Sequence, residues 1–183
     1  MADTKEQFET VIALCRDIYS RKLRDYGASW RIMRPQSITD QILIKAKRIR
    51  NIEINKTKLI DEGITPEFIG IVNYCTIALI QLELGFADSA DLSYDRALEL
   101  YDKHIQATKE LMYAKNHDYG EAWRLMRVSS YTDLILTKLN RIKEIENNDG
   151  QVSVSEGIGA NYQDIINYAL FGLIKLTQEK EFY

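Results

Sequence analysis

Apolar residues recur at steps of three and four over six stretches of the chain, which is the spacing of one buried face of an α-helix. The first stretch covers about residues 5–25, the second begins at Ser37 and the third at Thr65. The same three stretches recur between about residues 98 and 178. Because the third and the sixth stretch are apolar on most of their circumference, we expect those two helices to lie at the centre of the core.

Residue types that favour helix ends mark the predicted boundaries. Gly27 and Gly120 each follow the last apolar position of a stretch, so we expect both to have positive φ and to close a helix. Ser37 and Ser130 each stand three residues before an aspartate, which predicts a capping box at the start of the following helix. Thr65 is predicted to cap the third helix, with Pro66 at its first helical position.

The chain contains one sequence twice, at an offset of 93 residues. Asp25–Glu53 and Asp118–Glu146 are identical at 17 of 29 aligned positions, many more than two unrelated sequences of average composition would share. The most similar part reads Asp-Tyr-Gly-x-x-Trp-Arg-x-Met-Arg in both copies. The sequence therefore predicts two tandem repeats of three helices each.

Neither repeat alone has enough helices to cover both sides of its apolar third helix, so we expect the two to share one core. We predict an all-α, six-helix bundle in which residues 5–85 superpose on 98–178 by a rotation near 180° about a pseudo-two-fold axis. The first repeat is expected to span residues 1–86 and the second 96–183, joined by a linker at 87–95.

Composition narrows the function classes without selecting one. Charged residues make up 28% of the chain and the net charge is −3, so no overall basic charge favours extended duplex nucleic acid or an anionic membrane. Polar residues interrupt the most apolar stretch, and the sequence predicts no membrane span. Cys15 and Cys75 lack metal-binding spacing, which is typical of reduced, buried thiols in a cytoplasmic protein. The N-terminus lacks the pattern of a signal peptide.

The repeated motif places acidic and aromatic side chains at the end of the first helix of each repeat. They are Asp25, Tyr26 and Trp30 in the first copy and Asp118, Tyr119 and Trp123 in the second. In a functional interpretation the rings stack on a base and the carboxylate binds a metal or a polar edge. The alternative is a structural corner in which the aromatic residues pack and the glycine sets the turn. Duplication preserves either kind of feature, so the sequence leaves both open.

A basic set follows the aromatic motif in each repeat. Its members are Arg31, Arg34, Lys45 and Arg48 in the first copy and Arg124, Arg127, Lys138 and Arg141 in the second. Guanidinium groups bind phosphate oxygens in a bidentate manner, so this set predicts contacts with a phosphorylated ligand. The alternative is a solvent-exposed face or salt bridges with nearby aspartates. Each set is too small for extended duplex DNA.

Several carboxylates are candidates for Mg²⁺, which takes one or two carboxylates together with phosphate oxygens of a ligand. Glu110 lies two helical turns before Asp118 on the same predicted helix, which makes it the nearer candidate partner. Glu9, by contrast, lies about 24 Å along the helix from Asp25, and Glu6 lies further still, so both are excluded from the site of their own repeat.

Asp164 and Asn167 share one face of the otherwise apolar sixth stretch. Burying such groups is costly unless they have partners, and a ligand or a metal would be one. The alternative is that Asn161 caps this helix and Asp164 completes a capping box. Gly70 occupies the position of Asp164 in the first repeat, so we predict that any site is better formed in the second.

These motifs carry a family resemblance. Lys-x-x-Asp-Tyr-Gly-x-x-Trp-x-x-Met-Arg, followed by Ser-x-x-Asp, Lys-x-x-Arg-Ile and, in the second copy, Asp-x-x-Asn-Tyr, resembles the nucleotide modification associated domain family in two tandem copies. The resemblance implies a link to modified nucleotides. The chain is also distantly similar to the all-α MazG-like nucleotide pyrophosphatases, which implies Mg²⁺ held by paired acidic motifs. Glu6-x-x-Glu9 and Glu99-x-x-Asp102 have that spacing but belong to different repeats.

The leading hypothesis is therefore a cytoplasmic protein that binds a nucleotide or another phosphorylated small molecule with Mg²⁺, with pyrophosphohydrolase activity as the implied extension. The residues assigned to the ligand are Tyr119, Trp123, Arg124, Arg127, Lys138, Arg141, Asn167, Tyr26, Trp30, Arg31 and Arg34, and those assigned to the metal are Asp118, Glu110, Asp164 and Asp25. The rival hypothesis is a non-catalytic helical scaffold that binds a partner, and a homodimer is compatible with both. Convergence of Asp118, Tyr119 and Arg124 on one pocket would favour the first hypothesis, and dispersal the second.

Overall fold

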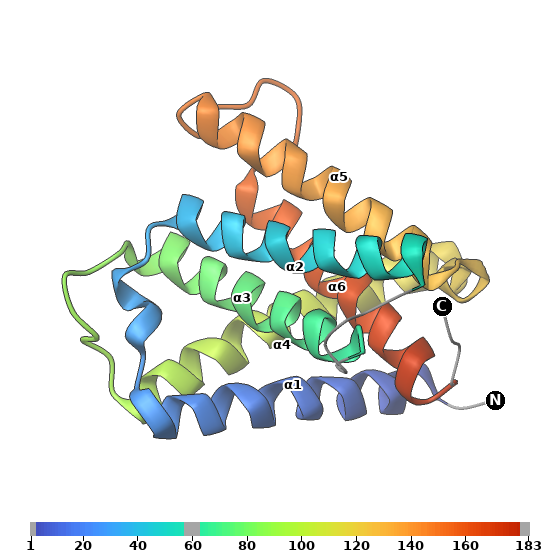
Figure 1. The fold of residues 1–183 in the computed structure, drawn as a ribbon, viewed down its shortest axis with the longest axis horizontal. Helices are drawn as coiled ribbons and strands as arrows, with labels where there is room; N and C mark the ends of the chain where they lie inside the picture. Colours follow the sequence, from blue (N-terminus) through green and yellow to red (C-terminus); the bar gives the residue numbers. More distant parts are fainter. Residues whose placement is uncertain (1–2, 57–62, 180–183) are drawn as a thin grey trace.

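The computed structural model describes residues 3–56 and 63–179, and these residues form helices and no strand (Figure 1). The elements are α1 (Thr4–Tyr26), η1 (Ser29–Ile32), α2 (Pro35–Asn55), α3 (Thr65–Leu84), α4 (Tyr94–Tyr119), η2 (Ala122–Leu125), α5 (Val128–Asn147) and α6 (Ile158–Thr177), where η1 and η2 are single 3₁₀ turns. The predicted all-α fold is confirmed. Each repeat contributes three α-helices and one 3₁₀ turn in the same order.

The two central helices are α3 and α6, as their all-round apolarity predicts. They pack against each other, α2 and α5 pack against them, and α1 and α4 cover the opposite side (Figure 1). Buried residues from all six helices form one continuous cluster. The two repeats therefore share a single core.

Helix α3 is the one helix of the described ranges that is long and apolar enough to cross a membrane. Its core positions Ile71, Val72 and Ile80 are fully buried against the neighbouring helices. A central helix buries most of its circumference, so packing inside the bundle accounts for this composition.

Contacts between the repeats occur in reciprocal pairs. Three contacts each recur with the repeats exchanged: Arg16–Asp102 with Lys109–Glu9, Arg50–Asp133 with Lys143–Asp40, and Thr39–Glu146 with Thr132–Glu53. A two-fold relation produces this exchange, because each surface then meets its own equivalent. The rotation near 180° itself stays a prediction.

The predicted capping boxes at Ser37 and Ser130 are wrong. Helices α2 and α5 begin earlier, at Pro35 and Val128, and neither has a side-chain cap. Proline suits the first helical position because its φ is already close to the helical value and it has no N–H to satisfy. The aspartates assigned to the boxes instead pair with basic residues of the other repeat. The prediction of Thr65 as the cap of the third helix is also wrong: α3 begins at Thr65 itself, and the residue before it, Ile64, makes no side-chain cap.

Helix α6 also begins earlier than the capping alternative requires. It starts at Ile158, so Asn161 lies inside the helix, where its side-chain amide donates to the carbonyl of Gly157. The interpretation of Asn161 as an N-cap with Asp164 in the box is therefore wrong. Asp164 has other partners, described below.

The predicted conformations of Gly27 and Gly120 are confirmed, with φ of 68° and 57°. Each glycine N–H donates to the carbonyl four residues earlier, Leu23 and Asn116 respectively, at 2.9 Å. Glycine tolerates positive φ because it has no Cβ. Both first helices therefore end at the same point, and the chain turns into η1 or η2.

Candidate functional site

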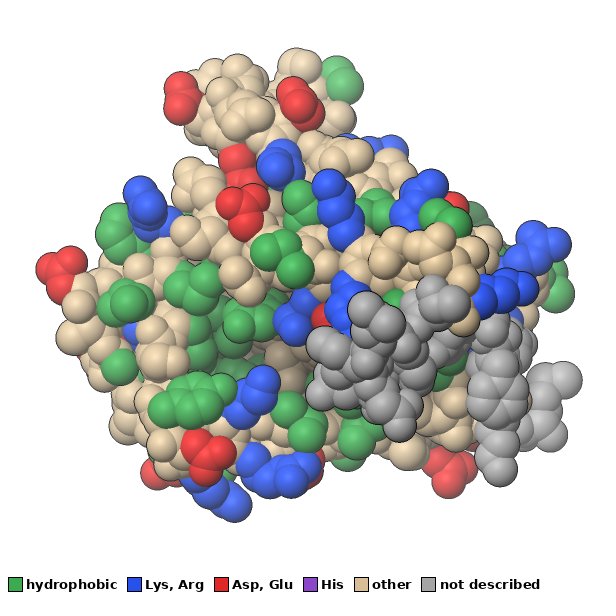
Figure 2. Space-filling model, in the orientation of Figure 1, with side chains coloured by type: hydrophobic (Ala, Val, Ile, Leu, Met, Phe, Trp, Pro, Cys, Tyr) green, Lys and Arg blue, Asp and Glu red, His purple; other side chains and the backbone are tan. Residues whose placement is uncertain are grey.

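The first repeat contains a pocket of about 530 Å³ between the end of α1, η1 and the first half of α3. Tyr26 and Trp30 line it from the corner, and Asn73 and Tyr74 line it from α3. Figure 2 shows hydrophobic side chains gathered over α1 and α3 on one face of the molecule, with Lys and Arg side chains beside them. The sequence motif thus borders a concave site in the first repeat.

The second repeat contains a pocket of about 360 Å³ at the equivalent place. Lys22, Tyr26, Trp30, Asn73 and Tyr74 of the first pocket correspond to Lys115, Tyr119, Trp123, Asn167 and Tyr168 of the second. Both repeats therefore build a pocket from the same aromatic, amide and basic positions.

Trp123 and Phe171 form the apolar wall of the second pocket. Their rings stack with centroids 4.6 Å apart and planes within 9°, and Trp123 is only 5% exposed. Tyr119, by contrast, is 73% exposed and stands at the rim. The second pocket thus has an apolar inner wall in which Trp123 is held between Phe171 and Arg124, and an exposed aromatic ring, Tyr119, at its mouth.

Two buried polar atoms in residues of this pocket lack hydrogen-bond partners within the described ranges: Nε1 of Trp123 and Oδ1 of Asn167. Nδ2 of Asn167 donates to the carbonyl of Thr108 at 3.3 Å. An unpaired buried donor or acceptor costs about 1–3 kcal/mol, so such groups are rare in folded proteins. One of the two is a donor and the other an acceptor.

The first repeat satisfies the equivalent amide. Oδ1 of Asn73 accepts from the hydroxyl of Tyr101 at 2.7 Å, and Nδ2 donates to the carbonyl of Cys15 at 3.1 Å. Tyr101 belongs to the second repeat, and its equivalent in the first repeat is Phe8, which packs edge-on against Trp123 and Phe171. Because Phe8 has no hydroxyl, it offers Asn167 no donor.

Asp164 lies at the second pocket between two lysines. Its carboxylate oxygens accept from Nζ of Lys115 at 2.7 Å and of Lys138 at 2.8 Å. Burial alone would raise the pKa of Asp164, but the hydrogen bonds and charges of the two lysines outweigh it and lower the pKa below its ordinary value. The carboxylate of Asp164 is therefore ionised at neutral pH and forms ion pairs with both lysines.

The stability contributed by Asp164 is expected to depend on pH. A lowered folded-state pKa stabilises the protein above the unfolded-state value, about 3.9, and this stabilisation is lost as the pH falls through the folded-state value. We expect Asp164→Asn to lower the free energy of unfolding by about 2–3 kcal/mol at neutral pH, less than for a fully buried pair because Lys115 is 45% exposed. The difference from the parent protein should be constant above about pH 5 and shrink below about pH 4.

Urea denaturation of both proteins between neutral and acidic pH measures this difference directly, and the other carboxylates cancel in the comparison. A difference that stayed constant down to pH 3, or grew on acidification, would contradict the ion-paired state of Asp164.

The first arginine of each basic set is engaged with the protein. Arg31 is 4% exposed and donates to Asp91, Gln81 and the carbonyl of Gly85. Arg124 donates to Glu121, Glu179, Gln7 and Thr4 and lies 4.3 Å from the ring centroid of Trp123. These bonds hold the 3₁₀ turns in place, and neither arginine lines either of the two pockets described above.

Equivalent side chains of the central helices also hold these turns. Nε2 of Gln81 donates to the carbonyls of Trp30, Arg31 and Met33. Lys175, at the same position of α6, donates to the carbonyls of Arg124 and Met126. The corner is thus a structural feature as well as a pocket wall, so the two interpretations of the motif do not exclude each other.

The remaining candidates do not converge on one point. Arg34 and Arg127 are exposed residues preceding α2 and α5. Asp25 and Asp118 are exposed and line neither pocket, and Glu110 accepts from Gln106. Of the three side chains used to separate the hypotheses, Asp118, Tyr119 and Arg124, only Tyr119 lines either pocket. By the criterion stated for these three residues the dispersal favours the scaffold hypothesis, so a ligand site would have to be formed by the other pocket residues.

The proposed metal ligands are likewise separated. Within residues 3–56 and 63–179, no group of three Asp, Glu, His or Cys side chains is placed to hold a metal ion. Asp164 lines the second pocket, but its oxygens already accept from two lysines. The described side chains therefore do not fit a Mg²⁺ centre formed by the protein alone.

Several pocket residues were not predicted. Tyr74 and Tyr168 line the pockets next to the asparagines, and Lys22 and Lys115 line them from the first helices. The sequence does contain a signal for each, because the pair Asn-Tyr and the lysine three residues before the aspartate recur at equivalent places in both copies. The role of Phe171 has no such signal, since the first repeat has Ile77 there.

A family model described as "Nucleotide modification associated domain 1" matches residues 22–82 and 115–176, which is most of the chain. The chain belongs to this family. The two matched segments confirm the resemblance and the tandem copies predicted from the sequence. The first family segment runs from Lys22 to just past Gln81 and the second from Lys115 to just past Lys175, so each contains most of the residues that line one pocket. Searches of curated proteins and of solved structures gave no match.

Proposed function

We propose that this member of the nucleotide modification associated domain 1 family binds the base of a nucleoside or nucleotide in the second pocket. The observation that carries the proposal is the buried donor and acceptor, Trp123 Nε1 and Asn167 Oδ1, that lack partners among the described residues of this pocket. A nucleobase presents both acceptors and donors on its edge, so it offers a partner of the right kind for each of these two groups. The family description is consistent with such a ligand.

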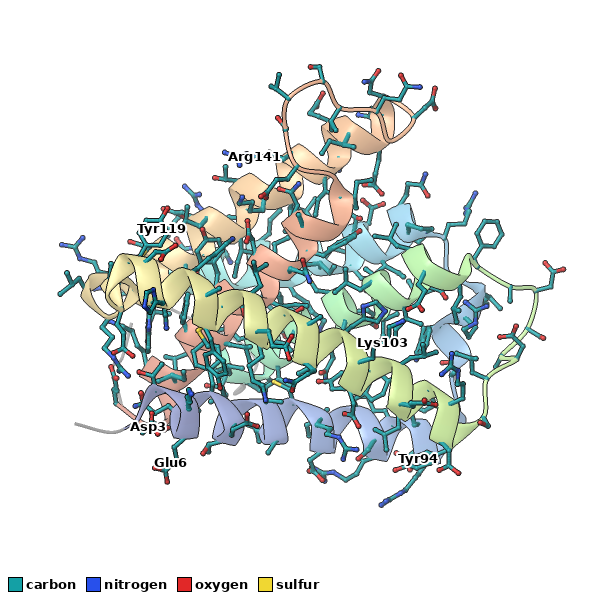
Figure 3. All side chains as sticks on the ribbon, turned by 180° about the vertical axis from the view of Figure 1, so that it is seen from behind. Asp3, Glu6, Tyr94, Lys103, Tyr119 and Arg141 are labelled. Atoms are coloured by element: carbon teal, nitrogen blue, oxygen red, sulfur yellow. The ribbon has the colours of Figure 1, made fainter. Side chains whose placement is uncertain are left out.

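The other walls suit the rest of a nucleotide. Tyr119 at the rim is free to cover a base by stacking. Arg141 is exposed on α5, and Figure 3 shows Arg141 and Tyr119 on the same face of the molecule. Arg141 would therefore contact phosphates that extend from the mouth, because a guanidinium binds phosphate oxygens. We assign no phosphate contact to Arg124, whose bonds are used within the protein.

Binding is the activity that the side chains support. Hydrolysis of the kind suggested by the distant MazG-like similarity needs a cation that lowers the charge of the phosphates. The described residues do not fit a metal centre of their own, so Mg²⁺ would have to arrive bound to the nucleotide. Nucleotide binding is therefore expected with and without Mg²⁺.

Nucleosides test the proposal most sharply because they lack phosphate. We expect calorimetric titration with the common nucleosides to show one that binds, and Trp123→Phe to weaken it about five- to tenfold, since one net hydrogen bond is worth about 1 kcal/mol. Phe8→Tyr should also weaken binding, because its hydroxyl would offer Asn167 an internal donor. The matched control is Trp30→Phe, which alters the equivalent residue of the other pocket and should leave the affinity unchanged.

If no nucleoside binds the parent protein, or if Trp123→Phe and Trp30→Phe behave alike, the second pocket is not a base site. Nucleotide titrations with and without Mg²⁺, with an assay for released pyrophosphate, then separate binding from hydrolysis. Absence of any nucleotide binding would favour the scaffold hypothesis.

A further inference from the structure

Three basic positions recur around the two pockets, and each set faces one acid on the last helix of its repeat. The sets are Lys22, Lys45 and Arg48 in the first repeat and Lys115, Lys138 and Arg141 in the second. The acid is Glu67 in the first repeat and Asp164 in the second. These two acids do not occupy equivalent positions: Glu67 corresponds to Asn161, and Asp164 corresponds to Gly70, one helical turn further along.

The position of the acid decides which basic side chains are paired. Glu67 accepts from Arg48 at 2.9 Å and lies 3.5 Å from Nζ of Lys45. Asp164, one turn further along, instead accepts from the equivalents of Lys22 and Lys45. As a result, no acid of the described ranges pairs with Lys22 at the first pocket, whereas its counterpart Lys115 is occupied.

Gly70 is part of the arrangement in the first repeat. A Cβ at Gly70 would lie 2.9 Å from Cδ and Cε of Lys45, so the glycine leaves room for the lysine side chain to cross α3 toward Glu67. Nζ of Lys45 also lies 5.8 Å from the ring centroid of Tyr74. Lys45 is thereby held at the wall of the larger pocket, while Lys22 stands opposite it on α1.

We propose that the first pocket binds a phosphate attached to a planar ring, with Lys22 contacting the phosphate, and that Asp164 closes the equivalent place of the second pocket to anions. The identification of the planar ring as a nucleobase rests on the function proposed above. Tyr26, Trp30 and Tyr74 provide aromatic walls for the ring in a pocket of about 530 Å³. In the first pocket Glu67 already pairs with Lys45, so the phosphate is assigned to Lys22. In the second pocket the carboxylate of Asp164 already pairs with Lys115, the counterpart of Lys22, and leaves no place there for a second anion.

The chain allows each pocket to be observed separately. It contains two tryptophans, and each lines one pocket. In Trp123→Phe the fluorescence of Trp30 reports on the first pocket, and in Trp30→Phe that of Trp123 reports on the second. Uridine 5′-monophosphate, uridine and inorganic phosphate serve as probes, so that ring and phosphate contributions are distinguished.

We expect the monophosphate to change the fluorescence of Trp30 at lower concentration than uridine does. In the same background Lys22→Met should weaken this response about tenfold or more, because a hydrogen bond to a charged group is lost. Lys47→Met is the matched control, since Lys47 is exposed on α2 and lines no pocket. Equal effects of the two lysine variants, or no response of Trp30 to either phosphate compound, would overturn the proposal.

Variants that add an aspartate at Gly70 or remove Asp164 test whether this carboxylate excludes anions from a pocket. Gly70→Asp should abolish the phosphate-dependent response of Trp30, whereas Asp164→Gly should let inorganic phosphate alone change the fluorescence of Trp123, which it should not do in the parent protein. Asp164→Asn keeps the helix propensity closer to that of the parent and should give the same gain. If neither Asp164 variant responds to phosphate, Asp164 does not exclude anions. Uridine binding at Trp123 without phosphate binding at Trp30 would refute this inference alone, and the converse would refute the proposed function alone.

Discussion

Replacing Phe171 by alanine is expected to lower the free energy of unfolding by about 3–5 kcal/mol, as for other large buried aromatic side chains. Phe171 is 8% exposed and stacks on Trp123. It also meets the rings of Phe8 and Tyr131, which belong to α1 and α5. The substitution would therefore remove an aromatic contact shared by both repeats and leave a cavity beside the second pocket.

Urea denaturation of the purified variant measures the loss. Leu125→Ala is the matched control, because Leu125 is 90% exposed and its truncation should change the stability by less than about 0.5 kcal/mol. A Phe171→Ala protein as stable as this control would contradict a shared aromatic core.

Arg31→Met is expected to lower the free energy of unfolding by about 3 kcal/mol. The substitution removes charged hydrogen bonds to Gln81 and to the carbonyl of Gly85 in a buried place, and each such bond is worth about 1.5–3 kcal/mol. The ion pair with Asp91 is expected to contribute little to the stability, because the Asp91 side chain is half-exposed. Without the arginine, η1 and the segment after α3 lose their common anchor.

Arg124→Met provides the comparison within the same chain. The side chain of Arg124 is 20% exposed, and its partners Glu121 and Glu179 are 36% and 30% exposed. Water can therefore replace part of its bonding, and we expect a loss of about 1–2 kcal/mol. An equal or larger loss for Arg124→Met would show that burial does not decide the contribution of these arginines.

The helices and their central pair could be predicted because apolar periodicity is a property of short stretches of sequence. The starts of α2 and α5 could not, since Asp40 and Asp133 pair with Lys143 and Arg50 of the opposite repeat rather than with their own helix ends. A capping motif is read from local spacing, and here a tertiary contact takes the side chain that the motif requires.

Part of the candidate site could also be predicted from the sequence. The aromatic motif identifies the pocket walls, because Tyr119 and Trp123 line the second pocket. The hydrogen-bond partners of the Arg124 side chain could not be predicted, because Thr4, Gln7 and Glu179 come from the two ends of the chain. The unpaired oxygen of Asn167 also depends on distant sequence: the difference between Tyr101 and Phe8 decides it, and no local pattern connects these residues with α6.

The reciprocal contacts between the repeats also bear on how the two pockets were able to become different. If each repeat were a separate chain in a symmetric dimer, one gene would encode both halves and every substitution would appear twice. Joined in one chain, the halves mutate independently, and their association no longer depends on protein concentration. Phe8 in one half then changes the surroundings of Asn167 in the other, while Tyr101 keeps its hydroxyl bonded to Asn73. Covalent linkage thus lets a protein keep one satisfied asparagine as a structural support and leave its counterpart for a different use.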